Sequence, residues 1–524
     1  MSAIATGWAR RRSTDIPCAR ACNTSSEHQG EWIAATRDGR RIFFERATLR
    51  LLPFRPVRLP CRRIHPPRTL AVRNAASPVQ PAPTRHCRGN TMPSTCPSPV
   101  RVRLSALLAS LVWMSGCTAG GPPPSSRSPG HDPAAGNTSP LRLERSVMLM
   151  RHGVRPPTKA KVAPANMHDK PWPTWSVDYG ELTPHGYAAV RLLGQWDRGY
   201  WAQRGLLPAT GCPATGDVEI AASSKSRTQD TARALVEGML PGCSIELRFP
   251  ASADDDVDFH PFGAAAGAMA IDADEAMRAV AALEPPGGLQ AEVKANARRF
   301  ALLNTALGCS ETRKASGCDL ARMPTGLVRN EGDRPDVGDP FGLASTISQT
   351  FLLEYLEGMP MEDVAWGRLS REQIAELLEF HSLKFYYEGR APYVAARAAS
   401  PLASRMLDAL LQGPRLTVLV GHDTNIADLG GFLDLHWQVT GYPRDDPPPA
   451  GALGFEVLAD QSGRRYVRAF YRAQTMDQVR ELQPLSQTNA PALEFLPIPG
   501  CATPCPLSDF EAMVRAKLVQ PGQH

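Results

Sequence analysis

The chain has 524 residues and a formal net charge of +6, and its hydrophobic fraction of 43% is ordinary for a globular protein that buries a sizeable core. The charge is unevenly placed: residues 1–116 hold 19 arginines, no lysine and 5 acidic residues, which leaves 39 basic and 47 acidic residues in 117–524. The part expected to fold is therefore acidic, which argues against a nucleic-acid-binding protein. An anionic ligand would have to be captured by a local cluster of arginines.

An export signal is predicted over 92–117. Met92 is followed by two arginines, by an apolar run over 104–114 and by small residues just before Cys117, which is the layout of a bacterial signal peptide. The apolar run is shorter than the ~20 residues that span a bilayer. The layout fits either cleavage near Cys117 or lipidation of Cys117. Lipidation is the only attachment to a membrane that we expect for this chain. The mature protein is expected in the periplasm or cell envelope.

The segment 1–91 is rich in Arg and Pro and differs from the rest of the chain. Because an export signal belongs at a true amino terminus, we expect translation to start at Met92 rather than Met1, and the upstream segment to be a non-native or disordered extension. A natural N-terminal domain is the alternative. After the signal, 118–140 is dense in Pro, Gly and Ser and predicts a flexible linker, so the folded domain is expected over 141–524.

Three short apolar runs that end in polar residues occur at 146–150, 218–222 and 416–420. Runs of this length are typical of buried strands in a sheet that is covered on both faces. In open α/β sheets, ligands bind beyond the carboxyl ends of the strands. We therefore expect one site where the ends of these three strands meet.

The region between 254 and 343 has helical periodicity and no clear strand, which predicts a mainly helical second lobe inserted into the α/β domain. Further helices are expected over 343–356 and 371–388, and strands over 455–458 and 465–471 are expected to form a hairpin at the edge of the sheet. The predicted fold class is α/β, with a central, mostly parallel sheet flanked by helices and an inserted helical lobe.

Six cysteines follow Cys117, an even number that suits an oxidising compartment. Their spacing predicts three local disulfides, each worth ~2–3 kcal/mol through restriction of the unfolded chain. A zinc site is a poorer interpretation, because no C-x-x-C pair or neighbouring histidine accompanies them. The expected pairs are Cys212–Cys243, Cys309–Cys318 and Cys501–Cys505.

The sequence Arg151-His152-Gly153-Val154-Arg155-Pro156-Pro157 follows the first predicted strand. Phosphoryl transfer depends on positioning and on stabilising negative charge on the phosphoryl oxygens. Two arginines that flank a histidine supply planar donors that hold phosphate oxygens in pairs, and a neutral imidazole between them can attack phosphorus and form a covalent intermediate. The motif predicts His152 as the nucleophile and Arg151 and Arg155 as phosphate ligands.

The sequence Gly421-His422-Asp423-Thr424-Asn425 follows the third predicted strand. His422 can donate to a phosphate oxygen, and Asp423 can protonate the departing alkoxide. An alkoxide is a poor leaving group, so a positioned general acid is worth roughly 10²–10⁴ in rate. Beside several arginines, Asp423 would tend to ionise, which favours catalysis at acidic pH.

These residues resemble the histidine acid phosphatases, whose signature is R-H-G-x-R-x-P and which keep a His-Asp pair after a later strand. Further stretches, among them 171–175, 182–186 and 357–360, resemble bacterial periplasmic phytases and glucose-1-phosphatases, so that the likeness runs from about Ser146 to Cys501. The resemblance implies an exported acid phosphatase that hydrolyses small phosphomonoesters through a phosphohistidine, as a monomer and without a metal or cofactor.

The resemblance also assigns residues outside the two motifs. Arg227, which follows the second predicted strand, matches a further phosphate-binding arginine, and Thr158 and Lys159 match positions that face the substrate. Gln349 stands where phytase relatives carry an acidic residue, so the non-phosphate part of the substrate is expected to be bound differently. The segment Pro447–Gly451 replaces a more glycine-rich turn at the rim.

Several alternatives stay open at this point. Residues 422–425 favour a phytase or a broad acid phosphatase, whereas 361–367 favour a glucose-1-phosphatase. A phosphoglycerate mutase also places R-H-G after its first strand, but Arg155-Pro156, the export signal and the His422-Asp423 pair count against it. A cell-envelope lipoprotein that binds phosphorylated ligands without turnover is the non-enzymatic alternative.

Several other titratable residues are expected to be structural, surface or solvated residues rather than parts of a site. The histidines at 185, 260 and 381 lie apart from any acidic or cysteine cluster in the sequence, and we expect them to be structural or surface residues. Arg233, six residues after Arg227, is expected to be a solvated charge. The acidic run Asp254–Asp256 with Asp258 is expected to be a solvated turn rather than a metal site.

Overall fold

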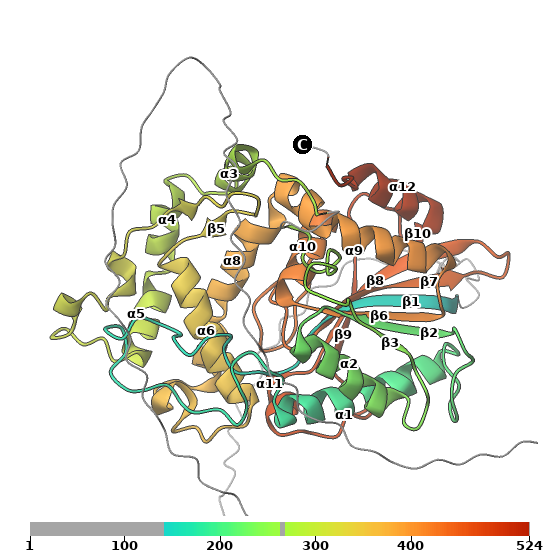
Figure 1. Ribbon diagram of the computed structural model, residues 1–524, viewed down its shortest axis with the longest axis horizontal. Coiled ribbons are helices and arrows are strands. Elements are labelled where there is room, and N and C mark those ends of the chain that lie inside the picture. Colours follow the sequence, from blue (N-terminus) through green and yellow to red (C-terminus); the bar gives the residue numbers. More distant parts are fainter. Residues whose placement is uncertain (1–140, 263–267, 523–524) are drawn as a thin grey trace, which may run out of the picture. The chain divides into compact units, whose positions relative to one another are not determined.

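The computed structural model describes residues 141–262 and 268–522. The predicted extension, export signal with Cys117 and linker lie outside the described residues. Strand β1 (Arg142–Arg151) lies inside an eight-stranded sheet with the order β10-β8-β7-β1-β6-β2-β3, in which β9 also pairs with β8 (Figure 1). The first described strand is therefore an inner strand, paired along both sides.

The parallel part of the sheet contains β1, β2 (Val218–Ala222), β3 (Leu247–Arg248) and β6 (Leu416–Gly421). In the register, Met150 and Ala222 both lie opposite Val420, so β1, β2 and β6 end at the same level. The three strands predicted from the apolar runs are confirmed. Their carboxyl ends form one edge, as the parallel arrangement requires.

The antiparallel part follows in the chain as β7 (Ala452–Ala459), β8 (Arg465–Ala473), β9 (Ala492–Leu496) and β10 (Cys505–Pro506). The hairpin of β7 and β8 is confirmed, but its predicted place at the sheet edge is wrong. Strand β7 pairs with β1, and all eight of its residues are buried. An inner strand covered on both faces shows no alternation of polar residues. Five strands (β1, β2, β3, β6, β8) run in one direction and three run against them, which confirms the α/β class with a mostly parallel sheet.

Helices cover both faces of this sheet because alternate side chains of each strand point to opposite faces. Met148 and Met150 pack in the core beneath α1 (Pro184–Gln203) and α2 (Ser226–Met239). Val147 and Leu149 pack in the core beneath α9 (Pro392–Gln412) and α10 (Asp423–Leu433), with α12 (Leu507–Lys517) on the same side (Figure 1). The helices that follow β2 and β6 thus begin at the edge where the strands end.

The rest of the described chain is mainly helical. The predicted helix over 343–356 is confirmed, and the one over 371–388 is present as two helices that meet at Leu378. The region 254–343 also contains two paired two-residue strands that the periodicity did not predict. The elements are α3 (Ala273–Ala281), α4 (Gly288–Ala295), α5 (Ala297–Ala306), η1 (Lys314–Ser316), η2 (Leu320–Arg322), β4 (Leu327–Val328), β5 (Asp336–Val337), α6 (Phe341–Leu356), η3 (Val364–Gly367), α7 (Arg371–Leu377), α8 (Glu379–Arg390) and α11 (Met476–Arg480).

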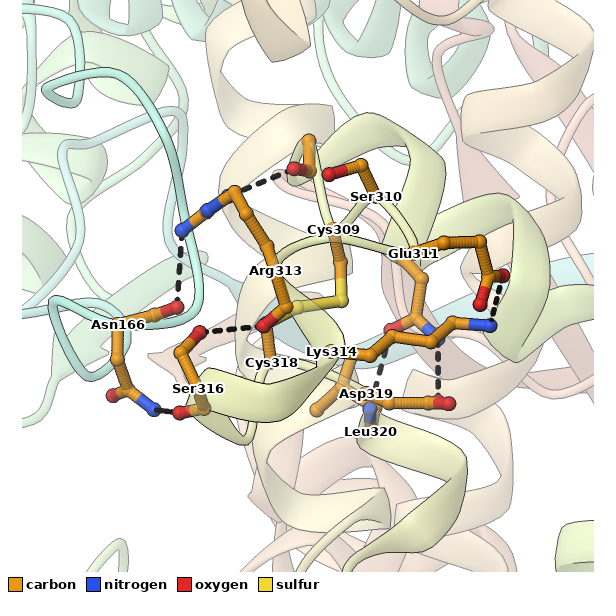
Figure 2. The surroundings of a disulfide bond; sticks show 12 residues. Asn166, Cys309, Ser310, Glu311, Arg313, Lys314, Ser316, Cys318, Asp319 and Leu320 are labelled. Atoms are coloured by element: carbon orange, nitrogen blue, oxygen red, sulfur yellow. Dashed lines mark hydrogen bonds and ion pairs between the residues drawn. A yellow bond between two sulfur atoms is a disulfide. The ribbon is translucent and has the colours of Figure 1, made fainter.

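The three predicted disulfides are confirmed as Cys212–Cys243, Cys309–Cys318 and Cys501–Cys505. Figure 2 shows the second, which closes a loop after α5. Within that loop Arg313 donates to the backbone oxygen of Asn166 (3.0 Å), and the Asn166 side chain donates to Ser316 O (2.9 Å). The disulfide thereby stiffens a loop that holds the long segment after β1 in place. Among the helices described, none combines the length and apolarity that crossing a bilayer requires.

Candidate active site

A cavity of about 420 Å³ opens where β1 and β6 end. Near the strand ends it is lined by Arg151, Arg155 and Asp423. His152 lies beside Arg155, and Arg227 lies beside His422, next to this lining. We name Arg151, His152, Arg155, Arg227 and His422 the strand-end cluster. The opposite side is formed by α6 and α8, and we name Gln349, His381 and Lys384 the helical wall. A larger cavity of about 1030 Å³ lies beside β8 and β9, but its lining contains no residue of the two motifs. The chemistry therefore belongs to the smaller cavity.

His152 is held by the backbone of two neighbouring segments. Its N–H donates to Gly421 O (3.0 Å), and its carbonyl accepts from Ala450 N (3.0 Å). The ring Nδ1 lies 2.9 Å from Gly153 O, and since a carbonyl only accepts, Nδ1 carries the hydrogen. The other nitrogen, Nε2, therefore carries no hydrogen, and its lone pair accepts a long hydrogen bond of 3.4 Å from Arg155 Nε.

The surroundings of His152 keep its imidazole neutral. The residue is 1% exposed. Burial is the largest cause that lowers the pKa of His152 well below its ordinary value, and the nearby charges of Arg155, Arg227 and Arg151 lower it further. A neutral imidazole with an unprotonated Nε2 is the reactive form for attack on phosphorus, and it persists here at acidic pH.

The arginines of the cluster converge on the same space. Arg151 is 1% exposed and donates to Pro447 O (2.6 Å) and to Gln349 Oε1 (3.1 Å). Within the described ranges, the Nε atoms of Arg151 and Arg227 are buried without a hydrogen-bond partner. Burial lowers the pKa of Arg155 to about 9, Asp423 opposes this, and Arg151 and Arg227 add to it. Crowded guanidinium groups with unused donors favour the binding of an anion with several oxygens.

His422 caps the start of α10 and faces His152, with ring centroids 5.6 Å apart. Its Nε2 lies 3.2 Å from Ser223 Oγ, and that hydroxyl donates to Asp256 Oδ2 (2.7 Å). Ser223 therefore accepts from His422 Nε2, which leaves the lone pair on Nδ1, 3.5 Å from Arg227. His422 must gain a proton on Nδ1 before it can donate to a phosphate oxygen there.

Asp423 is the first residue of α10 and lies at the cavity between an arginine and a histidine. Its Oδ2 is 2.7 Å from Arg151 and 3.7 Å from His381 Nε2. Burial raises the pKa of Asp423, but the charge of Arg151 and the hydrogen bond and charge of His381 outweigh burial, so that the pKa lies well below its ordinary value. The carboxylate is ionised when the cavity is empty.

The remaining predicted residues occupy different places. Thr158 and Lys159 are exposed and line the cavity, together with Lys161. Arg233 is exposed on α2 and pairs with Asp230, as expected of a solvated charge.

One expectation was wrong, the solvation of Asp256, and two of the histidines have acidic neighbours in space that the sequence did not show. His381 is not isolated from acidic residues, since its Nδ1 lies 2.6 Å from Asp446 Oδ1. His260 stacks on His422 with ring centroids 5.3 Å apart and lies 3.5 Å from Asp256. Asp256 is 1% exposed rather than solvated, because it accepts hydrogen bonds from the two residues that follow β2. The third histidine of that group, His185, contacts only a backbone carbonyl among the hydrogen bonds of the described chain.

Sequence reasoning missed two residues of this network. Ser223 directly follows β2, and the convergence of polar residues at strand ends could have identified it. Asp446 lies 65 residues after His381 in a loop, and no local pattern connects the two. In the part of the chain that the structure describes, no group of three or more His, Cys, Asp or Glu side chains is arranged to hold a metal ion.

The sheet order and the strand-end cluster define an α/β protein with paired motifs after its first and its late parallel strand. The chain belongs to the histidine phosphatase superfamily (branch 2), whose family model matches residues 142–285 and 344–472.

Individual relatives agree with this assignment. Phytase AppA of Escherichia coli (strain K12) is 32% identical over 386 residues, which cover 69% of this chain and 87% of the relative. A glucose-1-phosphatase of Salmonella typhimurium is 28% identical over 389 residues, covering 71% and 91%. The solved structure of Hafnia alvei phytase in complex with tartrate has a TM-score of 0.67 and 32% identity, and the match covers 72% of this chain and 98% of that one.

Proposed function

We propose that this protein is an acid phosphatase that hydrolyses phosphomonoesters through a covalent phosphohistidine at His152. One observation carries the proposal: the imidazole is neutral, and its unprotonated Nε2 lies among arginines, two of which have a buried Nε without a partner in the described residues. A nucleophile beside empty anion-binding donors suits attack on a phosphate ester. Family membership and the phytase and glucose-1-phosphatase relatives support the same reaction.

In the first step the substrate's phosphate lies between Arg151, Arg155 and Arg227, with His422 on the side of Ser223. Nε2 of His152 forms a bond to phosphorus while the bond from phosphorus to the alcohol oxygen breaks. Asp423 gives its proton to that oxygen, and the alcohol leaves. In the second step water attacks phosphorus, its proton returns to Asp423, and the bond to Nε2 breaks to release inorganic phosphate.

Asp423 must gain a proton before it can act as the acid, and substrate binding provides the reason. In the empty cavity Arg151 holds the Asp423 carboxylate at 2.7 Å. A bound phosphate dianion competes for the same guanidinium and adds negative charge beside Asp423, and both effects raise the pKa of a carboxyl group. Asp423 is thus protonated in the complex with substrate, and we expect kcat/KM to fall as the pH rises from ~5 to ~8.

The cavity favours a substrate with more than one anionic group. Lys159 and Lys161 are exposed and line it, and a compact substrate with several phosphates would place its further charges near them. This favours phytate, or broad acid phosphatase activity, as the preferred assignment. Glucose-1-phosphate is the second candidate, supported by the glucose-1-phosphatase relatives.

The place of action is proposed from the sequence together with the disulfides. A signal over 92–117 would export the chain, and lipidation of Cys117 would anchor it in the cell envelope. Three disulfides suit an oxidising compartment such as the periplasm. We expect the exported enzyme to act as a monomer.

Kinetics on purified protein test this proposal. Phytate, glucose-1-phosphate and an aryl phosphate would be compared side by side, and the phosphoenzyme would be trapped by denaturing quench. We expect an acid-labile, base-stable phosphohistidine in the wild type, and His152→Ala to lose on the order of 10⁴-fold or more in kcat. Tight binding of phosphomonoester without product would instead identify a binding protein, and near-normal turnover by His152→Ala would exclude His152 as the nucleophile.

A further inference from the structure

Asp423, the acid of the proposed reaction, is the end of a buried chain of three side chains. Its Oδ2 lies 3.7 Å from His381 Nε2, and the other nitrogen of that ring, Nδ1, lies 2.6 Å from Asp446 Oδ1. His381 lines the cavity, whereas Asp446 lies behind it. The order from the cavity inward is carboxylate, imidazole, carboxylate.

The geometry of this chain is fixed by packing. His381 is 4% exposed and Asp446 is 0% exposed. The His381 ring packs edge-on against Phe385, with centroids 4.6 Å apart, and the backbone carbonyl of Asp446 accepts from Trp437 Nε1 (2.8 Å). A buried carboxylate that faces one nitrogen of a histidine fixes the tautomer and orientation of the ring.

Counting hydrogens shows where this chain of side chains can hold one further proton. A carboxylate only accepts, so His381 Nδ1 carries a hydrogen toward Asp446. The other nitrogen, Nε2, faces the Asp423 carboxylate across 3.7 Å. A further proton on Nε2 would point at Asp423 Oδ2 and separate the two lone pairs.

We propose that His381 stores this proton and supplies it to Asp423, and that Asp446 holds His381 in the orientation required. The inference rests on the proposed function. When the phosphate displaces Asp423 from Arg151, the proton moves from His381 Nε2 to Asp423 and then to the leaving oxygen. His381 remains neutral, with Nδ1–H toward Asp446. In the second step a proton from water passes through Asp423 back to His381 Nε2. The number of protons on these side chains is therefore the same before and after one turnover.

The charged groups around the chain agree with this direction of transfer. Arg151 favours the ionised Asp423 in the empty cavity. On α8 itself, Lys384 is paired with Glu388, so it does not lie free beside His381. Behind Asp446, burial and the Asp446 charge raise the pKa of Tyr442, which stays neutral. The Asp446 carboxylate is thus the group that compensates a protonated His381.

The test compares leaving groups, because a proton supplied to the leaving oxygen matters only when that oxygen is basic. The substrates are p-nitrophenyl phosphate, whose phenolate leaves without help, and 2-glycerophosphate, whose alkoxide does not. The variants are His381→Gln and Asp446→Asn, the second of nearly unchanged volume in case the first does not fold. His436→Gln is the matched control, because His436 also lies 2.7 Å from an aspartate, Asp445, but does not line the cavity.

We expect each variant to lose ~10–100-fold in single-turnover rate on 2-glycerophosphate and less than ~3-fold on p-nitrophenyl phosphate, with His436→Gln unchanged on both. Equal losses on the two substrates by folded variants would show a merely structural role and overturn the inference. Unchanged rates on both would overturn it as well. A wild-type protein inactive on both substrates would instead overturn the proposed function, and the inference with it.

Discussion

The two sides of the cavity differ in how the chain builds them. In the strand-end cluster, functional side chains directly follow buried strands, and backbone hydrogen bonds such as His152 N to Gly421 O fix their positions. In the helical wall, Lys384 pairs with Glu388 within α8. Gln349 and His381 instead contact distant residues, Arg151 and Asp446. Strand register thus determines the side proposed to bind phosphate, whereas Gln349 and His381 depend on tertiary contacts that leave no local pattern.

Buried carboxyl groups show the same contrast. Asp423 lies beside Arg151 and His381, and its pKa is held well below the ordinary value although burial raises it. Glu354 in α6 has one backbone donor, Ala365 N at 2.9 Å, and burial raises its pKa to about 8. The charge of Arg151 keeps Asp423 ionised, whereas burial keeps Glu354 neutral up to a pH of about 8.

The largest change in kinetics is expected from a substitution in the strand-end cluster. Arg227→Ala removes one guanidinium from the strand-end cluster, and we expect kcat/KM to fall by ~10²–10³-fold, as for the loss of one charge-stabilising donor. Arg233→Ala is the matched control, because Arg233 lies on the same helix but is exposed and paired with Asp230. Steady-state kinetics on an aryl phosphate measure both. Similar losses in the two variants would mean that the general charge of α2, rather than the cluster, attracts the substrate.

The pH dependence of the unfolding free energy tests whether burial keeps Glu354 neutral. The folded pKa of Glu354, about 8, lies above its ordinary value of 4.5, so its contribution to stability is full below pH ~4.5 and is lost as the pH rises through ~8. Wild type should lose a few kcal/mol of unfolding free energy over this range, since one pKa unit is about 1.4 kcal/mol. Glu354→Gln should lose much less, whereas Glu362→Gln, at an exposed position, should follow the wild type. Parallel curves for Glu354→Gln and wild type in denaturant titrations would contradict the assignment.

The smallest change in kinetics is expected from a substitution in the helical wall. Gln349 accepts from Arg151 through Oε1, and its Nε2 is buried without a partner in the described part of the chain. Gln349→Glu removes this donor and places a negative charge beside Arg151, so we expect KM for a phosphomonoester to rise ~3–10-fold with a smaller change in kcat. Gln349→Met, of similar size, separates charge from shape. If both variants raise KM equally, the charge plays no part.

Much of this site was predictable from the sequence because it follows strands. The motif at Arg151–Arg155 and the pair His422-Asp423 each directly follow an apolar run, and parallel strands bring such positions to one edge. The contact of His381 with Asp446 was not predictable, because it joins a helix to a distant loop through a single hydrogen bond. The hairpin was misplaced for a related reason: the pairing of β7 with β1 joins the beginning and end of the domain, and only the three-dimensional structure shows it.

The position of β1 has a consequence for the nascent chain. Both neighbours of this strand, β6 and β7, are synthesised long after it, and the His152 carbonyl is bonded to Ala450 N only once the second of them is in place. Before β6 both edges of β1 are unpaired, and before β7 one edge still is; unpaired edges are open to wrong partners, and closure of such distant contacts is slow. We therefore expect a polypeptide interrupted before β7 to be inactive, because β1 then lacks one of its two neighbours.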